Sequence, residues 1–199
     1  ERRTAAGALL ATPFDAAAQR QLAATVGAFV GERPGLLAEV KPGSVALHYR
    51  KRPEMEAASL AFAIELARAD PRIELIEKGV FREEGQVSFC PNGMYSAIAG
   101  EESSEPAIHV PVTTIDAVLN GKRADIIKMD IEGAEHDALQ GAEQTIRAHK
   151  PRLAICLYHK VDDMLRIPEL ILKYVPEYKL YIRHQSQSCT DTILFAVTE

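Results

Sequence analysis

Three acidic side chains gather where a short apolar segment ends, and their types suit acid–base chemistry. The pattern predicts a strand over 125–129 that carries Asp130 and Glu132 past its carboxyl end, a turn at Gly133, and then a helix. Ligands of open α/β sheets bind beyond the carboxyl ends of parallel strands, which favours an active-site strand here. The alternative is that Asp130 caps the helix and that Glu132 and Glu135 complement its dipole. The stretch is Asp125-Ile126-Ile127-Lys128-Met129-Asp130-Ile131-Glu132-Gly133-Ala134-Glu135.

Two further residues extend this candidate site. Lys128 and Asp130 are two positions apart, so both point to the same face of the strand. They either orient a ligand together or form a plain structural ion pair. His159 follows the next apolar run, 153–158, and its titration near neutral pH suits a general base. The alternative is a histidine that hydrogen-bonds the backbone at a strand end.

Periodicity and breaker residues predict the elements that must position these side chains. A turn at Pro42-Gly43 joins 36–40 to 45–49 as an antiparallel hairpin, with the helix 53–69 packed on one face. Further strands are predicted at 73–80, 86–89, 110–112, 125–129, 153–158, 178–183 and 192–197. Helices are predicted at 14–30, with Asp15 as its N-cap, and at 53–69, 113–119, 134–148 and 168–174.

The order of these elements predicts an α/β fold with a helix–hairpin–helix segment at its start. From residue 73 onward strands alternate with helices, so we expect 73–80, 125–129 and 153–158 to be adjacent and parallel in one sheet. The last two strands are predicted to pair antiparallel. The change of pattern near Asp70-Pro71 divides the chain into a first segment, 1–70, and a second region, 71–199.

Composition and net charge argue against several classes of partner. The 199 residues are 47% hydrophobic and 26% charged with a net charge of −5, which argues against nucleic acid as a partner. No apolar run is long enough to span a membrane, so no membrane partner is predicted. Three widely spaced cysteines indicate a reducing, cytoplasmic setting, and Cys156 is expected to be an inert core thiol. No zinc-type spacing occurs, and no metal site is predicted.

From about residue 72 onward the chain resembles the FkbM family of S-adenosylmethionine-dependent methyltransferases. The resemblance implies a Rossmann-like sheet ending in a β-hairpin, and transfer of a methyl group to a hydroxyl of a sugar or other small-molecule acceptor, without a metal. It is carried, in order, by Glu77-Lys78-Gly79-Val80-Phe81, Val112-Thr113-Thr114-Ile115-Asp116, Ile127 to Glu135, Leu139-Gln140-Gly141-Ala142, Lys150-Pro151-Arg152-Leu153-Ala154, Tyr158-His159-Lys160, Ile167-Pro168-Glu169 and Tyr178 to His184.

The resemblance also implies roles for individual residues. Asp130, Glu132 and His159 are expected to act on the acceptor hydroxyl. Gly79, Val80 and Lys128 are the expected cofactor contacts, because a glycine at a strand end lets a ligand approach the backbone. For Gly79 the alternative is a turn or bulge.

One part of the FkbM pattern is missing from this sequence. That family begins with a strand, a glycine loop that cradles the cofactor, and a second strand ending in an acidic residue. The nearest approximation, Val26 to Gly31, follows a helical pattern rather than a strand. We therefore expect S-adenosylmethionine to bind weakly, and a catalytically inactive fragment or a binding module is the alternative function.

The first 70 residues resemble the small cap domain of trehalose-6-phosphate phosphatases. The resemblance rests on Glu39-Val40-Lys41, Ser44 to Arg50 and Pro53-Glu54. In that family the positions matching Lys41, His48 and Arg50 face a sugar-phosphate cleft; the alternative is that they are polar positions of an exposed hairpin. The catalytic half of a phosphatase is not present in the sequence, and a phosphatase fragment is the second alternative function.

Overall fold

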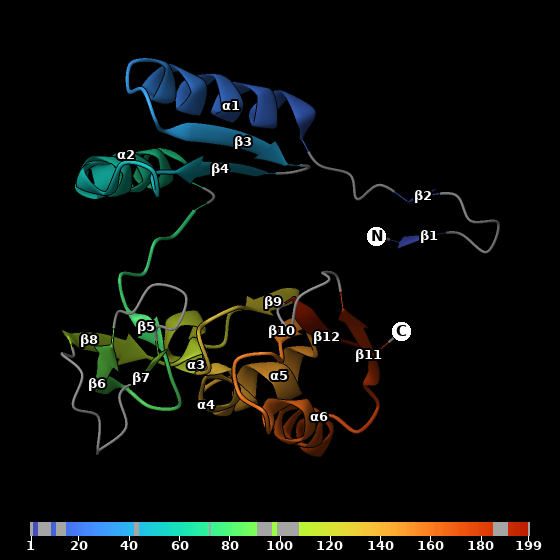
Figure 1. Cartoon of the computed structure of the whole chain (residues 1–199). Coiled ribbons are helices and arrows are strands. Elements are labelled where there is room, and N and C mark those ends of the chain that lie inside the picture. The colour runs from blue at the N-terminus through green and yellow to red at the C-terminus, as the bar shows by residue number, and fades with distance from the viewer. Residues whose placement is uncertain are drawn as a thin grey trace. The chain divides into compact units, whose positions relative to one another are not determined.

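The computed structural model describes residues 2–3, 9–10, 15–41, 44–71, 73–90, 97–98, 108–184 and 191–198. The chain divides into two compact units, Glu1–Ile76 and Glu77–Glu199 (Figure 1). The division falls shortly after the predicted boundary at Asp70-Pro71. The family assignments of the two segments stay predictions.

The first unit has the predicted order of helix, hairpin and helix. Its elements are β1 (Arg2–Arg3), β2 (Leu9–Leu10), α1 (Ala16–Gly31), β3 (Leu37–Lys41), β4 (Ser44–His48), a 3₁₀ turn at Pro53–Met55 and α2 (Glu56–Ala69). Asp15 caps α1 as predicted, because its side chain accepts hydrogen bonds from the backbone N–H groups of Ala17 and Ala18. The strands β3 and β4 pair antiparallel, with Leu37 opposite His48, which confirms the hairpin.

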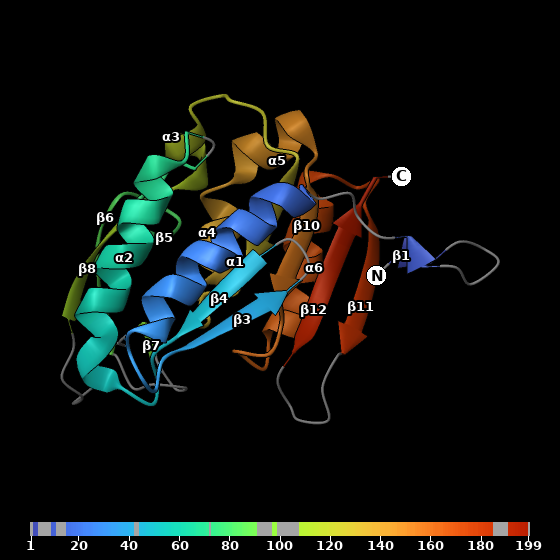
Figure 2. The same cartoon turned by 90° about the horizontal axis from the view of Figure 1, so that it is seen from above.

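Helix α1 packs along the hairpin and contacts both of its strands (Figure 2). This place had been predicted for residues 53–69. Helix α2 instead joins α1 through the stacked rings of Phe29 and Phe62, whose centroids are 4.0 Å apart. The sequence pattern predicts an apolar face on both helices. It does not determine which of the two helices packs on the hairpin of β3 and β4.

In its described residues the second unit has two four-stranded sheets and four helices. The first sheet has the order β5-β8-β6-β7 and the second the order β11-β12-β10-β9. The elements are β5 (Gly79–Val80), β6 (Gly85–Cys90), β7 (Ala97–Ile98), β8 (Ile108–Thr113), α3 (Ile115–Leu119), β9 (Ile126–Met129), α4 (Glu135–Gln140), α5 (Glu143–His149), β10 (Arg152–Cys156), α6 (Asp163–Tyr174), β11 (Lys179–His184) and β12 (Thr192–Val197).

The pairing of the second sheet confirms most of the predicted topology. β9 and β10 are parallel neighbours, with Ile127 opposite Leu153. β12 pairs antiparallel with both β10 and β11, so the last two strands form the predicted antiparallel pair. The fold is therefore mixed α/β, with parallel and antiparallel pairs in one sheet, and it brings the carboxyl ends of β9 and β10 to the same edge.

The prediction for residues 73–80 is wrong in two respects. Only Gly79 and Val80 form a strand, and that strand pairs with β8 in the other sheet rather than with β9 or β10. The preceding residues find no partner strand within the described part of the chain, and Ile73 and Leu75 are exposed. An apolar pattern alone does not make a strand without a partner for its backbone hydrogen bonds.

The helix predicted over 134–148 is two helices, α4 and α5, with a break at Gly141. A Cβ atom on Gly141 would lie 2.2 Å from the carbonyl oxygen of Phe81, so only glycine lets the two backbones approach this closely. The carboxylate of Asp116 then caps α5 by accepting hydrogen bonds from the N–H groups of Gln144 and Thr145, at 3.0 and 2.8 Å.

One apolar core joins the second sheet to the helices that cover it. Its buried side chains come from alternate positions of β9, β10 and β12 and from α4, α5 and α6; among them are Met129, Leu139, Ile146, Ile155, Ile171 and Leu194. Helix α6 begins at Asp163, earlier than predicted, and Pro168 lies within it. None of the helices in the described ranges is both long and apolar enough to cross a membrane.

Candidate functional site

A tight turn ends the strand β9 and places its acidic residues. Glu132 and Gly133 both have positive φ, 56° and 90°, and the N–H of Ala134 donates to the carbonyl of Ile131 at 3.3 Å. A left-handed conformation is costly for a residue other than glycine, about 1–2 kcal/mol, and such residues cluster at functional sites. The turn predicted at Gly133 is confirmed, and its strain is concentrated on the acidic Glu132.

The turn lies directly against the segment that follows β10. A Cβ atom on Gly133 would lie 3.2 Å from Cε of Lys160 and 3.6 Å from Cβ of His159. The two loops at the carboxyl ends of β9 and β10 are therefore in contact. This is the arrangement in which ligand sites form in α/β sheets.

Asp130 is held in its ionised form by hydrogen bonds. The Tyr158 hydroxyl donates to Oδ1 at 2.8 Å, and Nζ of Lys128 lies 3.6 Å from Oδ2, so the predicted pairing of Lys128 with Asp130 is confirmed. Partial burial acts to raise the pKa of Asp130, but the hydrogen bonds from Tyr158 and Cys156 outweigh it and the pKa falls below its ordinary value.

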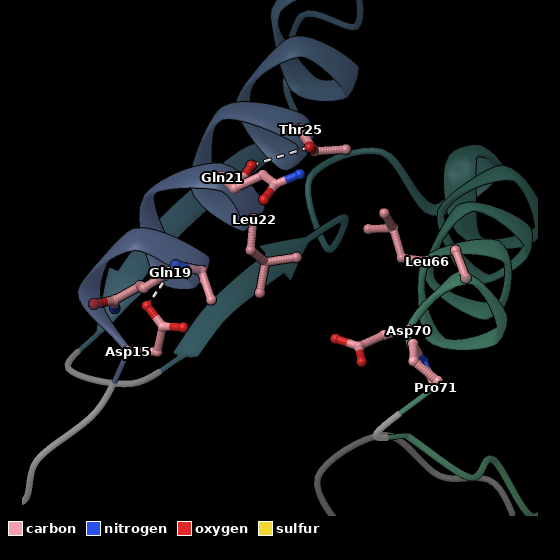
Figure 3. Close-up of a pocket in the computed structure, with 10 residues that line it drawn as sticks. Asp15, Gln19, Gln21, Leu22, Thr25, Leu66, Asp70 and Pro71 are labelled. Carbon is pink, nitrogen blue, oxygen red and sulfur yellow. Dashed lines mark hydrogen bonds between the residues drawn. The ribbon is translucent and has the colours of Figure 1, made fainter.

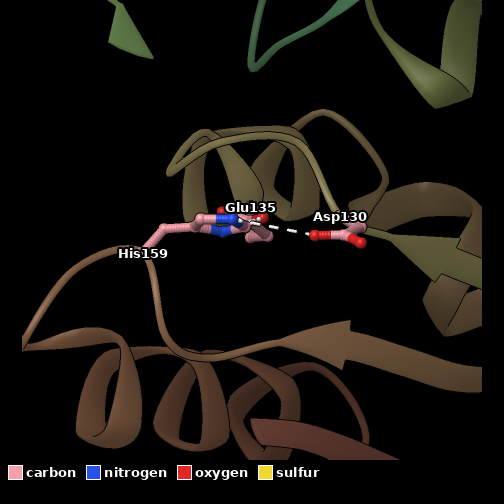
Figure 4. Close-up of side chains that lie close together, drawn as sticks. All are labelled: Asp130, Glu135 and His159. Carbon is pink, nitrogen blue, oxygen red and sulfur yellow. Dashed lines mark ion pairs between the residues drawn. The ribbon is translucent and has the colours of Figure 1, made fainter. Parts of the chain in front are cut away.

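His159 stands among three carboxylates, two of which, Asp130 and Glu135, are drawn with it in Figure 4. Its Nε2 atom lies 3.7 Å from Oδ1 of Asp130 and 3.5 Å from Oε2 of Glu132, and its Nδ1 atom lies 2.8 Å from Oε1 of Glu135. The His159 side chain is only 9% exposed, and that of Glu135 is fully buried. The three predicted catalytic residues, Asp130, Glu132 and His159, thus come together as expected from the strand ends.

The geometry excludes the capping interpretation of Asp130, and its catalytic role stays a prediction. The residue before α4 is Ala134, and no side chain caps the helix there. Glu135 instead reaches back to accept a hydrogen bond from the N–H of Ile131 at 2.9 Å. Asp130 is therefore free of the capping role and points its carboxylate to Tyr158.

The predicted cofactor contacts Gly79 and Val80 lie in a different sheet from β9 and β10, whose carboxyl ends carry the predicted catalytic residues. Gly79 and Val80 lie in β5, where a Cβ atom on Gly79 would be 3.1 Å from Cγ1 of Val112, and Val80 packs against the apolar core. Gly79 is thus a paired strand residue packed against Val112, and the alternative of a turn at this position is not what the structure has. The role of Gly79 and Val80 in binding a cofactor stays a prediction, as does that of Lys128, which is exposed beside Asp130.

Two buried acids at this site were not predicted as site residues. Glu135 and Asp163 are both fully buried, and neither oxygen of Asp163 has a hydrogen-bond partner within the described structure. Burial, together with the nearby charge of Glu135, raises the pKa of Asp163. The signal available in the sequence was weak, because an acidic residue in the first turn of a helix is common for dipole reasons alone.

Asp130, Glu135 and His159 are the described groups whose ligand atoms lie close enough together to hold a metal ion, within 4.8 Å of one another. Their present partners are protein groups: Tyr158 donates to Asp130, and the N–H of Ile131 donates to Glu135. Asp130 and Glu135 also face different nitrogens of the imidazole ring. The arrangement suits a chain of proton donors and acceptors better than a single cation.

A pocket lies elsewhere, within the first unit. It lies between α1 and α2 and has a volume of about 590 Å³ (Figure 3). Leu22 and Leu66 contribute apolar surface from the two helices, and Asp15 and Asp70 lie at one end. None of the predicted catalytic or cofactor residues lines it, so its size does not make it the candidate site.

Residues 88–179 match the model of the methyltransferase FkbM domain. This segment contains Asp130, Glu132 and His159, whereas Gly79 and Val80 precede it. The crystal structure of the methyltransferase FkbM from Methylobacillus flagellatus KT is similar to this chain, with 29% sequence identity and a TM-score of 0.55. The match covers 70% of this chain and 33% of that one.

The chain thus spans about one third of the length of that methyltransferase. No curated protein matches the chain. These comparisons support the FkbM resemblance of the second unit and give no support to the trehalose-phosphatase resemblance of residues 1–70.

Proposed function

We propose that the second unit carries an FkbM-type O-methyltransferase site that uses S-adenosylmethionine and acts on a hydroxyl of a sugar or other small metabolite. One observation carries this proposal. Within the segment that matches the FkbM domain, Asp130, Glu132 and His159 meet at the carboxyl ends of the parallel strands β9 and β10. Two carboxylates and an imidazole at that edge supply both a proton acceptor and negative charge.

The proposed roles follow from the directions of the polar atoms. Nε2 of His159 takes the proton of the acceptor hydroxyl. When bound, S-adenosylmethionine would supply the methyl group for the acceptor oxygen, with its thioether as the leaving group. Asp130 and Glu132 stabilise the imidazolium, because their carboxylates lie 3.7 and 3.5 Å from Nε2. Orientation of the two reactants contributes most of the rate.

The residues present fit one end of the cofactor. A sulfonium is a cation, and Asp130 keeps its negative charge because its pKa is lowered, so the acidic edge suits the reacting end. Asp130 and Glu132 would face it. A cradle for the nucleoside is not found among the described residues, because the space beside Gly79 is occupied by Val112.

The test is a transfer assay that measures S-adenosylhomocysteine by mass spectrometry. The chain is incubated with S-adenosylmethionine at several times a dissociation constant of about 1 mM, together with a panel of sugars and polyols. We expect product above that of heat-inactivated protein. His159→Gln should lower the rate about 100-fold or more, the usual contribution of a general base.

His109→Gln is the matched control, since His109 is an exposed histidine of β8 that contacts Ser88. It should leave the rate unchanged. The proposal fails if no acceptor yields product, or if His159→Gln transfers as fast as the unmodified chain. The inactive-fragment or binding-module alternative would then stand.

A further inference from the structure

Glu135 is a fully buried acidic residue at the site, and both Ile131 and His159 lie within hydrogen-bonding distance of its carboxylate. Its side chain is fully buried at the first residue of α4, and Oε1 accepts the N–H of Ile131 at 2.9 Å. The same oxygen lies 2.8 Å from Nδ1 of His159, off the direction of the ring N–H. Catalytic hydrogen bonds are often poorly aligned before a ligand binds. Oε2 of Glu135 has no partner within the described structure.

The local charges indicate what Glu135 needs. A buried carboxylate is strongly unfavourable unless several donors surround it. Within the described structure Glu135 has one, the N–H of Ile131 on Oε1, so a second donor from the His159 side would stabilise the carboxylate further. Lys128 is not available for this role, because it lies beside Asp130. The nearest titratable donor is the imidazole ring of His159, whose side chain is itself 9% exposed.

The opposite edge of the ring is in a different situation. Nε2 is more than 3.4 Å from both Asp130 and Glu132, beyond the length of a good hydrogen bond, so no hydrogen bond to either carboxylate holds a proton on Nε2. A ring with the proton on Nδ1 presents a donor to Oε1 of Glu135 and leaves Nε2 as an acceptor at the same time. The reverse tautomer would place the lone pair of Nδ1 against a carboxylate oxygen.

We propose that Glu135 is a positioning residue that holds His159 in the tautomer with the proton on Nδ1, so that Nε2 faces Asp130 and Glu132 as a proton acceptor. Only the catalytic consequence rests on the proposed methyl transfer; the tautomer is a property of the chain itself. In transfer, the hydroxyl proton moves to Nε2, the Nδ1–H stays with the ring, and Glu135 stabilises the imidazolium. A carboxylate fixed behind a histidine has this effect in hydrolases.

The direct test is nuclear magnetic resonance of the ring nitrogens in ¹⁵N-histidine-labelled protein, at a pH where the ring is neutral. The six histidines are assigned by difference, with His159→Gln removing the signal of interest. We expect His159 to carry its proton on Nδ1. In Glu135→Gln the amide can donate to Nδ1, so the signal should shift to the tautomer with the proton on Nε2.

Asp163→Asn is the matched control, because it removes a second fully buried carboxylate that has no hydrogen bond to the ring within the described structure. It should leave the tautomer unchanged. In the transfer assay Glu135→Gln should lower kcat about 100-fold with KM within about twofold, since Nε2 can no longer accept a proton. Glu135→Asp, which keeps the charge, should restore part of kcat.

The outcomes separate this inference from the proposed function. A proton on Nε2 in the unmodified chain, or an unchanged tautomer in a folded Glu135→Gln, overturns the inference even if transfer is observed. A divalent ion found in one-to-one ratio with the protein by elemental analysis, and lost in Glu135→Gln, also overturns it, because the ion would then hold the ring. If no transfer is detected but the tautomer responds as expected, the inference stands and the proposed function fails.

Discussion

At the scale of single residues, the site is defined by how each carboxylate is satisfied. Asp130 has hydrogen-bond donors and stays ionised, whereas Asp163 is buried without them and resists ionisation. Glu135 has one oxygen that accepts a hydrogen bond and one without a partner within the described structure. Residue type alone therefore does not assign a role, because environment sets the protonation state.

Asp163 should lower stability at neutral pH. Its raised pKa means that the folded state holds the proton more tightly than the unfolded state, so stability is lost as pH rises from the ordinary carboxyl range, near 3.8, through the raised value. Asp163→Asn should therefore stabilise the protein at pH 7, by about 1 kcal/mol, with the gain disappearing near pH 4. Urea unfolding at several pH values measures this.

The adjacent Asp162 is a matched control with the opposite sign. It is exposed, and a hydrogen bond from Arg166 lowers its pKa. Asp162→Asn should leave stability unchanged or slightly reduced at pH 7, since exposed pairs contribute little. Destabilisation by Asp163→Asn at pH 7 would show that its carboxylate has a compensating partner in solution.

Tyr158→Phe should raise the pKa of Asp130 by removing the largest of the effects that lower it. Because a lowered carboxyl pKa stabilises the folded state above the ordinary value and is lost as pH falls through the folded value, the variant should be less stable at pH 7. We expect a loss of about 0.5–1 kcal/mol, reduced by the partial exposure of Asp130.

Carboxyl ¹³C titration of Asp130 and urea unfolding measure these two effects. Tyr181→Phe, in an exposed tyrosine of β11, is the control and should change neither quantity. An unchanged Asp130 titration in Tyr158→Phe would contradict the assigned hydrogen bond.

At the scale of elements, glycine and capping residues decide how α4 and α5 are arranged. Several residues that carry the FkbM resemblance have structural roles here: Asp116 caps α5, and Gly141 allows the Phe81 carbonyl to approach. These contacts fix the break between the helices. The turn at Glu132 and Gly133 precedes α4, whose first residue is Glu135, next to His159.

Gly141→Ala should be among the more destabilising single substitutions in the second unit. The added Cβ would overlap the carbonyl oxygen of Phe81, which belongs to the backbone and cannot rotate away. We expect a loss of about 1–3 kcal/mol, the usual cost of overpacking. Gly27→Ala in α1 is the contrasting control.

Gly27 is exposed in the middle of a helix, and its Cβ would meet no atom within 4 Å. Alanine there should stabilise the helix by about 0.5–1 kcal/mol. Thermal unfolding followed by circular dichroism compares the two variants. Equal stability of Gly141→Ala and the unmodified protein would mean that the α4–α5 junction relaxes freely.

At the scale of the whole molecule, the reacting edge is present while a nucleoside cradle is not found in the described part of the chain. The chain spans about one third of the length of the similar methyltransferase, and β9 is at the edge of its sheet. A full cofactor site draws on several loops at strand ends. We therefore expect the proposed catalytic residues to be in place in this chain while S-adenosylmethionine binds weakly.

S-adenosylmethionine should bind this chain with a dissociation constant no better than about 1 mM, which corresponds to about 4 kcal/mol of binding free energy. Titration calorimetry measures it directly. Asp130→Ala should weaken binding further or abolish transfer, because it removes the carboxylate nearest the reacting edge. Micromolar binding would contradict the prediction, and an unaffected Asp130→Ala variant would contradict the assignment of the strand end.

Much of this arrangement was determined by the sequence itself. The alternation of apolar residues, the breakers and the turn at Gly133 predicted the parallel pair β9 and β10, the final antiparallel pair, and the meeting of Asp130, Glu132 and His159. These features are local or follow from strand direction, because carboxyl ends of parallel neighbours share an edge. The sequence pattern of each segment, together with the direction of its strand, suffices to predict these features.

Other features were decided only by the tertiary structure. The short β5 joined a different sheet, the helix over 134–148 broke at Gly141, and Glu135 was buried behind His159. Each depends on which distant segment supplies a hydrogen-bond partner or occupies a space. The local sequence pattern does not determine that choice, because strand pairing, backbone contact and burial are properties of pairs of segments. The same acidic side chain at the start of a helix is exposed or buried according to which segment packs over it.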